Sequence, residues 1–202
     1  MGIFFRRLVA GAMAVVVLAA CSSGDGGEGG GRAGGGDGGG SDDGEQAIVL
    51  AVTETRVESM AVSPGPFPED VWSNVYDVLN AYLDRALVRP LRSGQPPAAL
   101  EPLFSAPALE RATTVDRAAM LEEGTTLSGT VTSPRTHALL VLLTDRGGGP
   151  VVVNATVDLV LFVAPEGGGS VEVTRTGQVA LVHDGAGWVI DSYDLRVARD
   201  SR

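Results

Sequence analysis

The chain has 202 residues, which is enough for one ordinary domain with additional segments. Its net charge of −10 excludes a nucleic-acid partner, because phosphate backbones repel such a surface. The single cysteine excludes an intrachain disulfide and a zinc site built from several cysteines.

The first 20 residues have the three-part layout of a bacterial export signal. Arg6 and Arg7 precede the uncharged apolar run Leu8–Ala20, which is shorter than the roughly 20 apolar residues that a membrane-spanning helix needs. The ending Leu18-Ala19-Ala20-Cys21 resembles a lipobox, whose cysteine receives a diacylglyceryl group before cleavage and can then gain a further acyl chain such as palmitate. The resemblance implies a signal peptide at 1–20 and a lipid anchor on Cys21, at the outer face of the cytoplasmic membrane. The alternative is an ordinary secretory signal that happens to precede a cysteine.

Residues 21–46 have the composition of a flexible tether. Three glycine runs lie between residues 29 and 40, among aspartates and serines. Such a segment cannot bury enough apolar surface to offset its ordering entropy. The alternative, a glycine loop that cradles phosphate, requires a strand before it and a helix after it, and the sequence predicts neither. We therefore place the folded domain at residues 47–202.

The first part of this domain is predicted to be helical. A helix begins near Pro68, and its apolar residues recur every three or four positions, which predicts one buried stripe. The stripe consists of Val71, Val75, Val78, Leu79, Tyr82 and Ala86. Pro90 is predicted to end this helix. A short helical turn at 98–104 follows, and then a third helix, which Ser105 caps and Gly124 ends.

From Thr125 onward the pattern becomes extended. Segments rich in Val, Leu and Thr are separated in the later part by glycine turns, which predicts antiparallel hairpins. These segments are 127–133, 136–144, 151–164, 170–183 and 188–199. An apolar stretch at 47–57 is either an edge strand or the end of the tether. Helices followed by strands predict an α+β domain, with N-terminal helices on a curved, mainly antiparallel sheet of four to five strands.

Residue alternation divides the segment 151–164 into two faces. The predicted core face is Val151, Val153, Ala155, Val157, Leu159, Leu161 and Val163, and the mixed face is Val152, Asn154, Thr156, Asp158, Val160 and Phe162. We predict that the mixed face lines a pocket, meets a partner or faces water.

The last hairpin is predicted to be apolar on both sides. If His183 pairs with Trp188, one face holds Val179, Leu181, Trp188 and Ile190, and the other holds Val182, Val189, Tyr193, Leu195 and Val197. Exposed apolar surface usually marks an interface. We therefore expect a homodimer through the outer face of the sheet, or an envelope protein bound there.

The segment from His183 to Tyr193, with its glycine turn before a tryptophan and an alternating last strand, resembles the final hairpin of NTF2-like domains, also called cystatin-like. The order of helices and strands is similar to that family over residues 60–200. Within it, the chain looks most like Mce-associated and related envelope proteins of actinobacteria. The resemblance implies a helical layer on a curved sheet and a role beside an envelope or transport complex. The fold hosts both enzymes and inert scaffolds.

The residues carry no reactive motif, so we expect a non-enzymatic binding or assembly module with no metal and no cofactor. Two alternatives remain open, an isomerase- or dehydratase-like enzyme and a carrier of small apolar ligands. NTF2-like isomerases use a helix tyrosine with pocket carboxylates, which implies Tyr76 or Tyr82 with Asp158 if they face one cone. The candidate pocket residues are Tyr82, Asn154, Thr156 and Asp158. His137 and His183 are expected at the surface or at strand ends.

Overall fold

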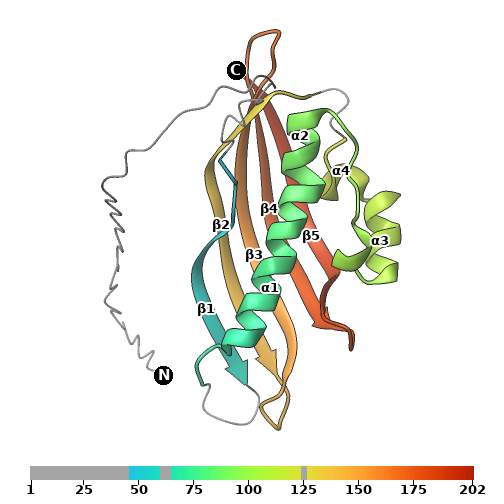
Figure 1. Ribbon diagram of the computed structural model, residues 1–202. Helices are drawn as coiled ribbons and strands as arrows, with labels where there is room; N and C mark the ends of the chain where they lie inside the picture. The colour runs from blue at the N-terminus through green and yellow to red at the C-terminus, as the bar shows by residue number, and fades with distance from the viewer. Residues whose placement is uncertain (1–45, 60–64, 124–126) are drawn as a thin grey trace, which may run out of the picture. The chain divides into compact units, whose positions relative to one another are not determined.

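Five strands form one sheet in the order in which they occur along the chain. The computed structural model describes residues 46–59, 65–123 and 127–202, so the predicted signal peptide, Cys21 and the tether up to residue 45 lie outside the described residues. The strands are β1 (Ala51–Ser59), β2 (Thr130–Thr144), β3 (Pro150–Ala164), β4 (Val171–His183) and β5 (Trp188–Ser201). β1 pairs with β2 in parallel, and all other neighbours are antiparallel. The predicted α+β class is confirmed, with a mixed five-stranded sheet (Figure 1).

The helices cover one face of this sheet, which we call the inner face (Figure 1). They are α1 (Glu69–Tyr82), the π-helical turn η1 (Leu83–Val88), α2 (Arg89–Ser93), the 3-10 turn η2 (Glu101–Leu103), α3 (Ala106–Thr113) and α4 (Arg117–Met120). The first three form one continuous run along the strands, and α3 and α4 contact β5. The hydroxyl of Ser105 accepts a hydrogen bond from the Ala108 N–H at 3.4 Å, which confirms the predicted cap of α3. The predicted third helix is nevertheless divided into α3 and α4, and Gly124, its predicted end, lies outside the described residues.

Pro90 does not end the first helix, so that prediction was wrong. Proline lacks an N–H and its ring collides with the carbonyl four residues earlier in a regular α-helix, here that of Ala86. The preceding turn widens instead, and the Arg89 N–H bonds to the Asp84 carbonyl five residues back. The run then continues to Ser93 and ends at Gly94, whose φ of 70° is left-handed.

The core lies between this helical run and the inner face of the sheet. Val71, Val75, Leu79, Tyr82 and Ala86 of the predicted stripe are buried, and Val78 is half-buried. The predicted core face of β3 is also confirmed from Val153 to Val163, where every second residue is at most 5 % exposed. Val151, at the end of that strand, is 47 % exposed.

β2 is one strand, although two segments were predicted there. The pairing with β3 shifts between Thr132 and Arg135, around Pro134. Such a bulge leaves the proline out of the ladder of hydrogen bonds, which it cannot join as a donor. The apolar stretch at 47–57 provides β1, an edge strand.

A second bulge corrects the predicted faces of the last hairpin. His183 does pair with Trp188, but Leu181 pairs with Ile190 while Ala180 pairs with Ser192. Asp191 is therefore an extra residue, and alternation changes phase after it. As a result Tyr193, Leu195 and Val197 share the inner face with Trp188 and Ile190, opposite to what was predicted.

Replacing Gly177 by alanine is expected to lower the free energy of unfolding by more than about 3 kcal/mol. Gly177 has a φ of +146°, and a Cβ there would lie 2.0 Å from the Asp194 carbonyl oxygen on β5. Gly148→Ala is the control, because its φ is +85° but no atom lies within 4 Å of the added Cβ. Its expected loss is about 1–2 kcal/mol. Urea unfolding followed by tryptophan fluorescence measures both, and equal losses would contradict the close contact.

Candidate functional site

The outer face of the sheet, opposite the helices, consists of rows of residues paired across the strands. The first row contains Glu58, Leu143, Val152, Val182 and Val189, one from each strand. The second contains Arg56, Val141, Asn154, Ala180 and Ser192, and a later one contains His137, Asp158, Thr176 and Arg196. Apolar side chains therefore gather at one end of the face and polar ones follow. We call Leu143, Val152, Val182 and Val189 the outer apolar row.

The outer apolar row lies at the end of the sheet that is remote from residue 46. That end, called the distal end, carries the β2–β3 and β4–β5 turns, the end of β1 and the start of α1 (Figure 1). The opposite end carries the β3–β4 turn, the C-terminus and the start of the described chain (Figure 1). There the Arg92 Nη2 donates to the Gln46 carbonyl at 3.0 Å. Residue 46, where the described chain begins, thus lies at the end away from the outer apolar row.

Three of the four candidate pocket residues lie together on the outer face, in the middle of β3. Asn154 Nδ2 is 3.5 Å from Gln178 Oε1, Thr156 is exposed, and Asp158 Oδ2 is 2.9 Å from Arg135 Nε. The shared face of Asn154, Thr156 and Asp158 agrees with the alternation of the strand.

Tyr82 lies on the other side of the sheet, so the structure does not join it to these three residues. It is buried at the end of α1, and its hydroxyl donates to the Met120 carbonyl at 2.7 Å. Tyr76 also has other partners: its ring stacks on Trp72 with the centroids 4.9 Å apart, and its hydroxyl donates a hydrogen bond to the Leu50 carbonyl at 3.2 Å. The reason is that α1 packs on the inner face, whereas Asp158 points outward. The acid–base group of Tyr76 or Tyr82 with Asp158 is therefore not assembled.

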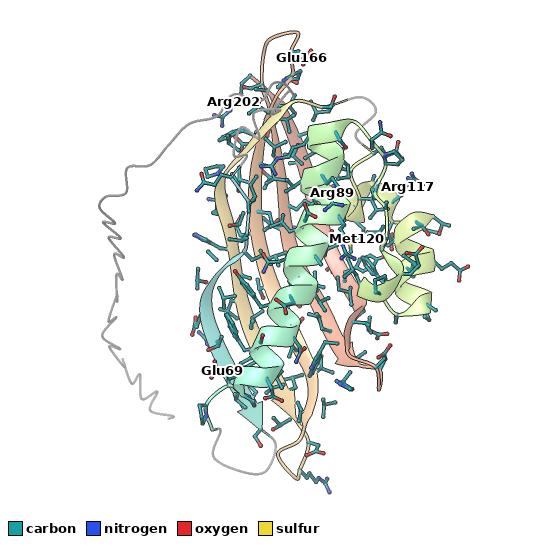
Figure 2. The ribbon with its side chains drawn as sticks, in the orientation of Figure 1. Glu69, Arg89, Arg117, Met120, Glu166 and Arg202 are labelled. Atoms are coloured by element: carbon teal, nitrogen blue, oxygen red, sulfur yellow. The ribbon has the colours of Figure 1, made fainter. Side chains whose placement is uncertain are left out.

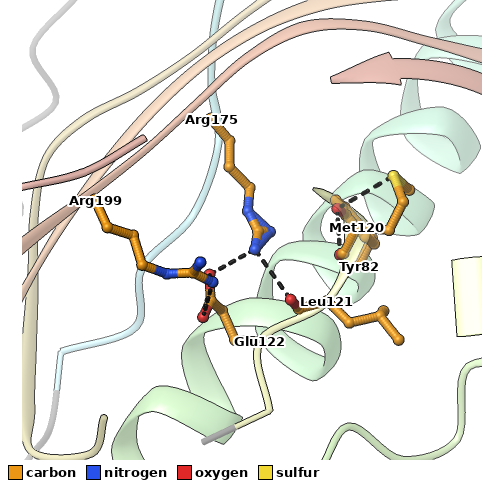
Figure 3. A network of polar contacts seen from close by, with 6 residues as sticks. All are labelled: Tyr82, Met120, Leu121, Glu122, Arg175 and Arg199. Atoms are coloured by element: carbon orange, nitrogen blue, oxygen red, sulfur yellow. Dashed lines mark hydrogen bonds and ion pairs between the residues drawn. The ribbon is translucent and has the colours of Figure 1, made fainter. Parts of the chain in front are cut away.

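A buried ion cluster on the inner face was not anticipated (Figure 3). Arg175 of β4 is 1 % exposed, and its Nη2 lies 2.5 Å from Glu122 Oε1 and 3.1 Å from the Leu121 carbonyl. Arg199 of β5, which is 44 % exposed, donates its Nη2 to the same carboxylate at 3.1 and 3.0 Å. Glu122 is 4 % exposed, so one buried carboxylate serves two guanidinium groups.

The helix widening before Pro90 helps to place this carboxylate. Because Pro90 has no N–H, the Ala86 carbonyl is available to another donor, and the Glu122 N–H bonds to it at 2.9 Å. Pi-helical turns of this kind frequently occur at functional sites. Here the turn binds the Glu122 N–H, while Leu121 and Glu122 bind Arg175 of β4 and Glu122 binds Arg199 of β5. The cluster thus couples the helical layer to the sheet by charge as well as by apolar contact.

Burial raises the pKa of the Tyr82 phenol to about 12, and Arg175 opposes this rise. The pKa of Tyr193 is also raised to about 12, by burial and by the adjacent Asp116 carboxylate, whose Oδ2 lies 3.2 Å from the phenol oxygen. Both phenols are therefore neutral hydrogen-bond donors at ordinary pH, and neither is poised to act as a base.

The histidines do not form a metal site with acids in the described part of the chain. Among the described residues there is no group of three or more His, Cys, Asp or Glu side chains that could hold a metal ion. His183 Nδ1 accepts a hydrogen bond from the Gly185 N–H at 3.2 Å, and its ring contacts Trp188 edge to face.

No helix in the described ranges is long and apolar enough to cross a membrane. Comparisons with family models, curated proteins and solved structures give no match.

Glu122→Leu is expected to lower the free energy of unfolding by about 3–5 kcal/mol, because it leaves Arg175 buried without its carboxylate. Adding Arg175→Met should recover most of this loss, since the buried charge is then removed as well. Arg199→Met is the control and should cost less than about 1 kcal/mol, because water solvates half-exposed ion pairs. Urea unfolding of the three variants tests this. A double variant no more stable than Glu122→Leu would show that the cost is not electrostatic.

Two of the three tyrosines, Tyr82 and Tyr193, should resist ionisation when the folded chain is titrated with base. A phenol whose pKa rises from 10 in the unfolded chain to about 12 in the folded one stabilises the fold fully below pH 10. This contribution is lost as the pH rises towards 12. Near-ultraviolet phenolate absorbance measures the titration, and Tyr82→Phe should remove one late-titrating group. Ordinary titration of all three tyrosines in the folded chain would contradict the burial.

Proposed function

We propose that this chain is a lipoprotein anchored through Cys21 at the outer face of the cytoplasmic membrane, and that its domain is a non-enzymatic binding or assembly module. The observation that carries the proposal is the difference between the two faces of the sheet. The inner face is buried under the helices, whereas the outer face bears an apolar row at the end remote from residue 46. Contiguous apolar surface on an otherwise acidic domain is typical of a protein-binding site.

The anchoring part of the proposal rests on the lipobox-like ending of the first 21 residues. Two or three acyl chains on Cys21 would hold the chain stably, because each buried CH₂ contributes about 0.8 kcal/mol. The described domain begins at residue 46, so the glycine-rich segment would link the anchor to the end of the domain opposite the outer apolar row.

The family part of the proposal rests on the order of elements. A long helix, shorter helices and then four antiparallel strands agree with an NTF2-like layout, and the envelope role follows the likeness to Mce-associated proteins. The enzyme alternative would need a tyrosine facing Asp158, but Tyr82 and Asp158 lie on opposite faces. The carrier alternative would need an open apolar interior, whereas Leu140, Leu142 and Leu161 are fully buried in the core. Both alternatives are therefore less well supported than a binding module.

A photo-crosslinker in place of Leu143, on the outer face, is expected to give one defined adduct in membranes. The same group in place of Ser73, on the exposed side of α1, should give none. An adduct of twice the mass of the chain would identify a homodimer, and another mass an envelope protein. Cys21→Ala should abolish lipid labelling, release the chain from membranes and weaken the adduct.

Two results would count against this function. A Cys21→Ala chain that still carries lipid and stays with the membrane would refute the anchor. Adducts that are absent from both positions, or equal from both, would refute the outer face as the binding surface.

A further inference from the structure

We infer that a groove at the distal end, beside Glu58, docks a partner protein segment that carries an apolar side chain next to an arginine or lysine. This inference rests on the proposed function, which leaves the chemistry of the partner open.

The groove has a volume of about 430 Å³ and lies at the distal end of β1, β2 and β3. Its apolar walls are Leu143, Val151 and Val152, and Glu58, Ser59, Thr144 and Asp145 complete it. Leu143 is 39 % exposed and Val151 is 47 % exposed, and they are two of the four exposed large apolar residues in the described part of the chain. Burying such side chains under an apolar anchor removes apolar surface from water and so favours binding.

The groove continues into the outer apolar row. Leu143 and Val152 belong to both, and the half-buried Val182 extends the row onto β4, whereas Val189 at its β5 end is 6 % exposed. A segment anchored in the groove can therefore continue over Val152 and Val182. This continuity fits a polypeptide better than a compact small molecule.

The charge at the lip of the groove selects a cationic neighbour for the anchor. Glu58 belongs to the first row of the outer face; among the described residues it forms no ion pair within 4.0 Å, and Arg56, which is paired with Glu54, attracts it only from a greater distance. Its counterpart two rows away, Glu54, is already paired with Arg56 Nε at 2.5 Å. Glu58 is thus the carboxylate on the outer face of β1 that can receive a charge from a partner.

Most other charged residues at the distal end are also negative, like Glu58. The first turn of α1 contains Glu69, which is labelled in Figure 2, and Asp70. The β2–β3 turn at 145–149 has one acid and one base, Asp145 and Arg146, and the β4–β5 turn at 184–187 has one acid, Asp184. Hydrogen bonds from the Ala186 and Gly187 N–H groups lower the pKa of Asp184, so it stays ionised. Acids outnumber bases among these residues of the distal end, and a basic rim on the partner is complementary.

The same charges argue against a second copy as the occupant. A two-fold dimer whose axis passes through the groove would bring the acids of one distal end next to those of the other. Like charges brought together at an interface are unfavourable. An anionic membrane surface is disfavoured for the same reason. The favoured occupant is therefore a different protein with basic and apolar residues.

The test uses the full chain in mild detergent and three fluorescent nine-residue peptides, which differ at the three central positions of a Gly/Ser sequence. The central residues are Arg-Leu-Arg, Glu-Leu-Glu or Arg-Gly-Arg. The first peptide should bind at least about tenfold more tightly than either of the others, which corresponds to about 1.4 kcal/mol. Added salt should weaken its binding, because salt screens exposed charges. Fluorescence anisotropy measures all three.

Matched variants assign the effect to the groove. Glu58→Gln should remove the preference for arginine over glutamate, and Leu143→Asn should remove the preference for leucine over glycine. Glu54→Gln, on the same face of the same strand, should change neither. Thermal unfolding confirms that each variant is folded. An unchanged preference in Glu58→Gln, or the same loss in Glu54→Gln, overturns the inference.

The inference and the proposed function fail separately. If Leu143 still crosslinks to an envelope protein in membranes but no peptide is preferred, the binding module stands and the docking chemistry is wrong. If the Leu143 adduct is a homodimer, a second copy occupies the groove and the inference is overturned. If neither crosslinking nor peptide binding occurs, both fail.

Discussion

The contact between the long helical run and the inner face of the sheet is the interaction on which the rest of this domain depends. Leu79, Leu83, Leu87 and Leu91 recur every four residues and are at most 1 % exposed. In a regular α-helix a four-residue repeat drifts by roughly 40° at each step, because one turn takes 3.6 residues. The π-helical turn over Leu83–Val88 takes more residues per turn and so opposes this drift. The widening that accommodates Pro90 thus also keeps the leucines directed at the sheet.

The ion cluster adds orientation to this apolar contact. Apolar packing is non-directional, and a leucine stripe tolerates sliding more readily than a hydrogen-bonded guanidinium does. Arg175 binds both the Leu121 carbonyl and the Glu122 carboxylate, and the Glu122 N–H binds the Ala86 carbonyl. A buried ion pair is weak evidence for stability, because desolvation offsets much of the attraction. Its effect here is to set one position of the segment 121–123 between the helical run and the sheet.

The predictable parts of the fold are those that follow from the spacing of apolar residues along the chain. The stripe of α1 and the core face of β3 follow from spacings of 3.6 and 2 residues, and both were predicted. The two bulges were missed because an extra residue in a strand leaves no mark on the local alternation. The passage of the helix through Pro90 was missed because proline normally ends a helix. Arg175 had a detectable signal, since it shares the alternation of Val173 and Val179. Its partner Glu122 is 53 residues away in a loop and had none.

The candidate site was predictable only as one face. Alternation placed Asn154, Thr156 and Asp158 together, but it could not tell which side of the sheet the helices cover, so Tyr82 was assigned to the same pocket. Alternation predicted Val182 and Val189 on one face of the last hairpin, but it could not align them with Leu143 and Val152. That alignment requires the register of four strands, which pairs Val152 with Leu143 on one side and Val182 on the other.

Charged side chains lie along β1, beside the outer apolar row. β1 is an edge strand, and an uncovered edge invites another strand to pair with it. Glu54, Arg56 and Glu58 place charges along the outer side of β1, which disfavours strand addition. In the proposed docking, acids at the distal end would oppose a dimer centred on the groove and would leave the groove to a basic partner. The selectivity for that partner and the unfavourable self-contact would then have one cause, the negative charge of the distal end.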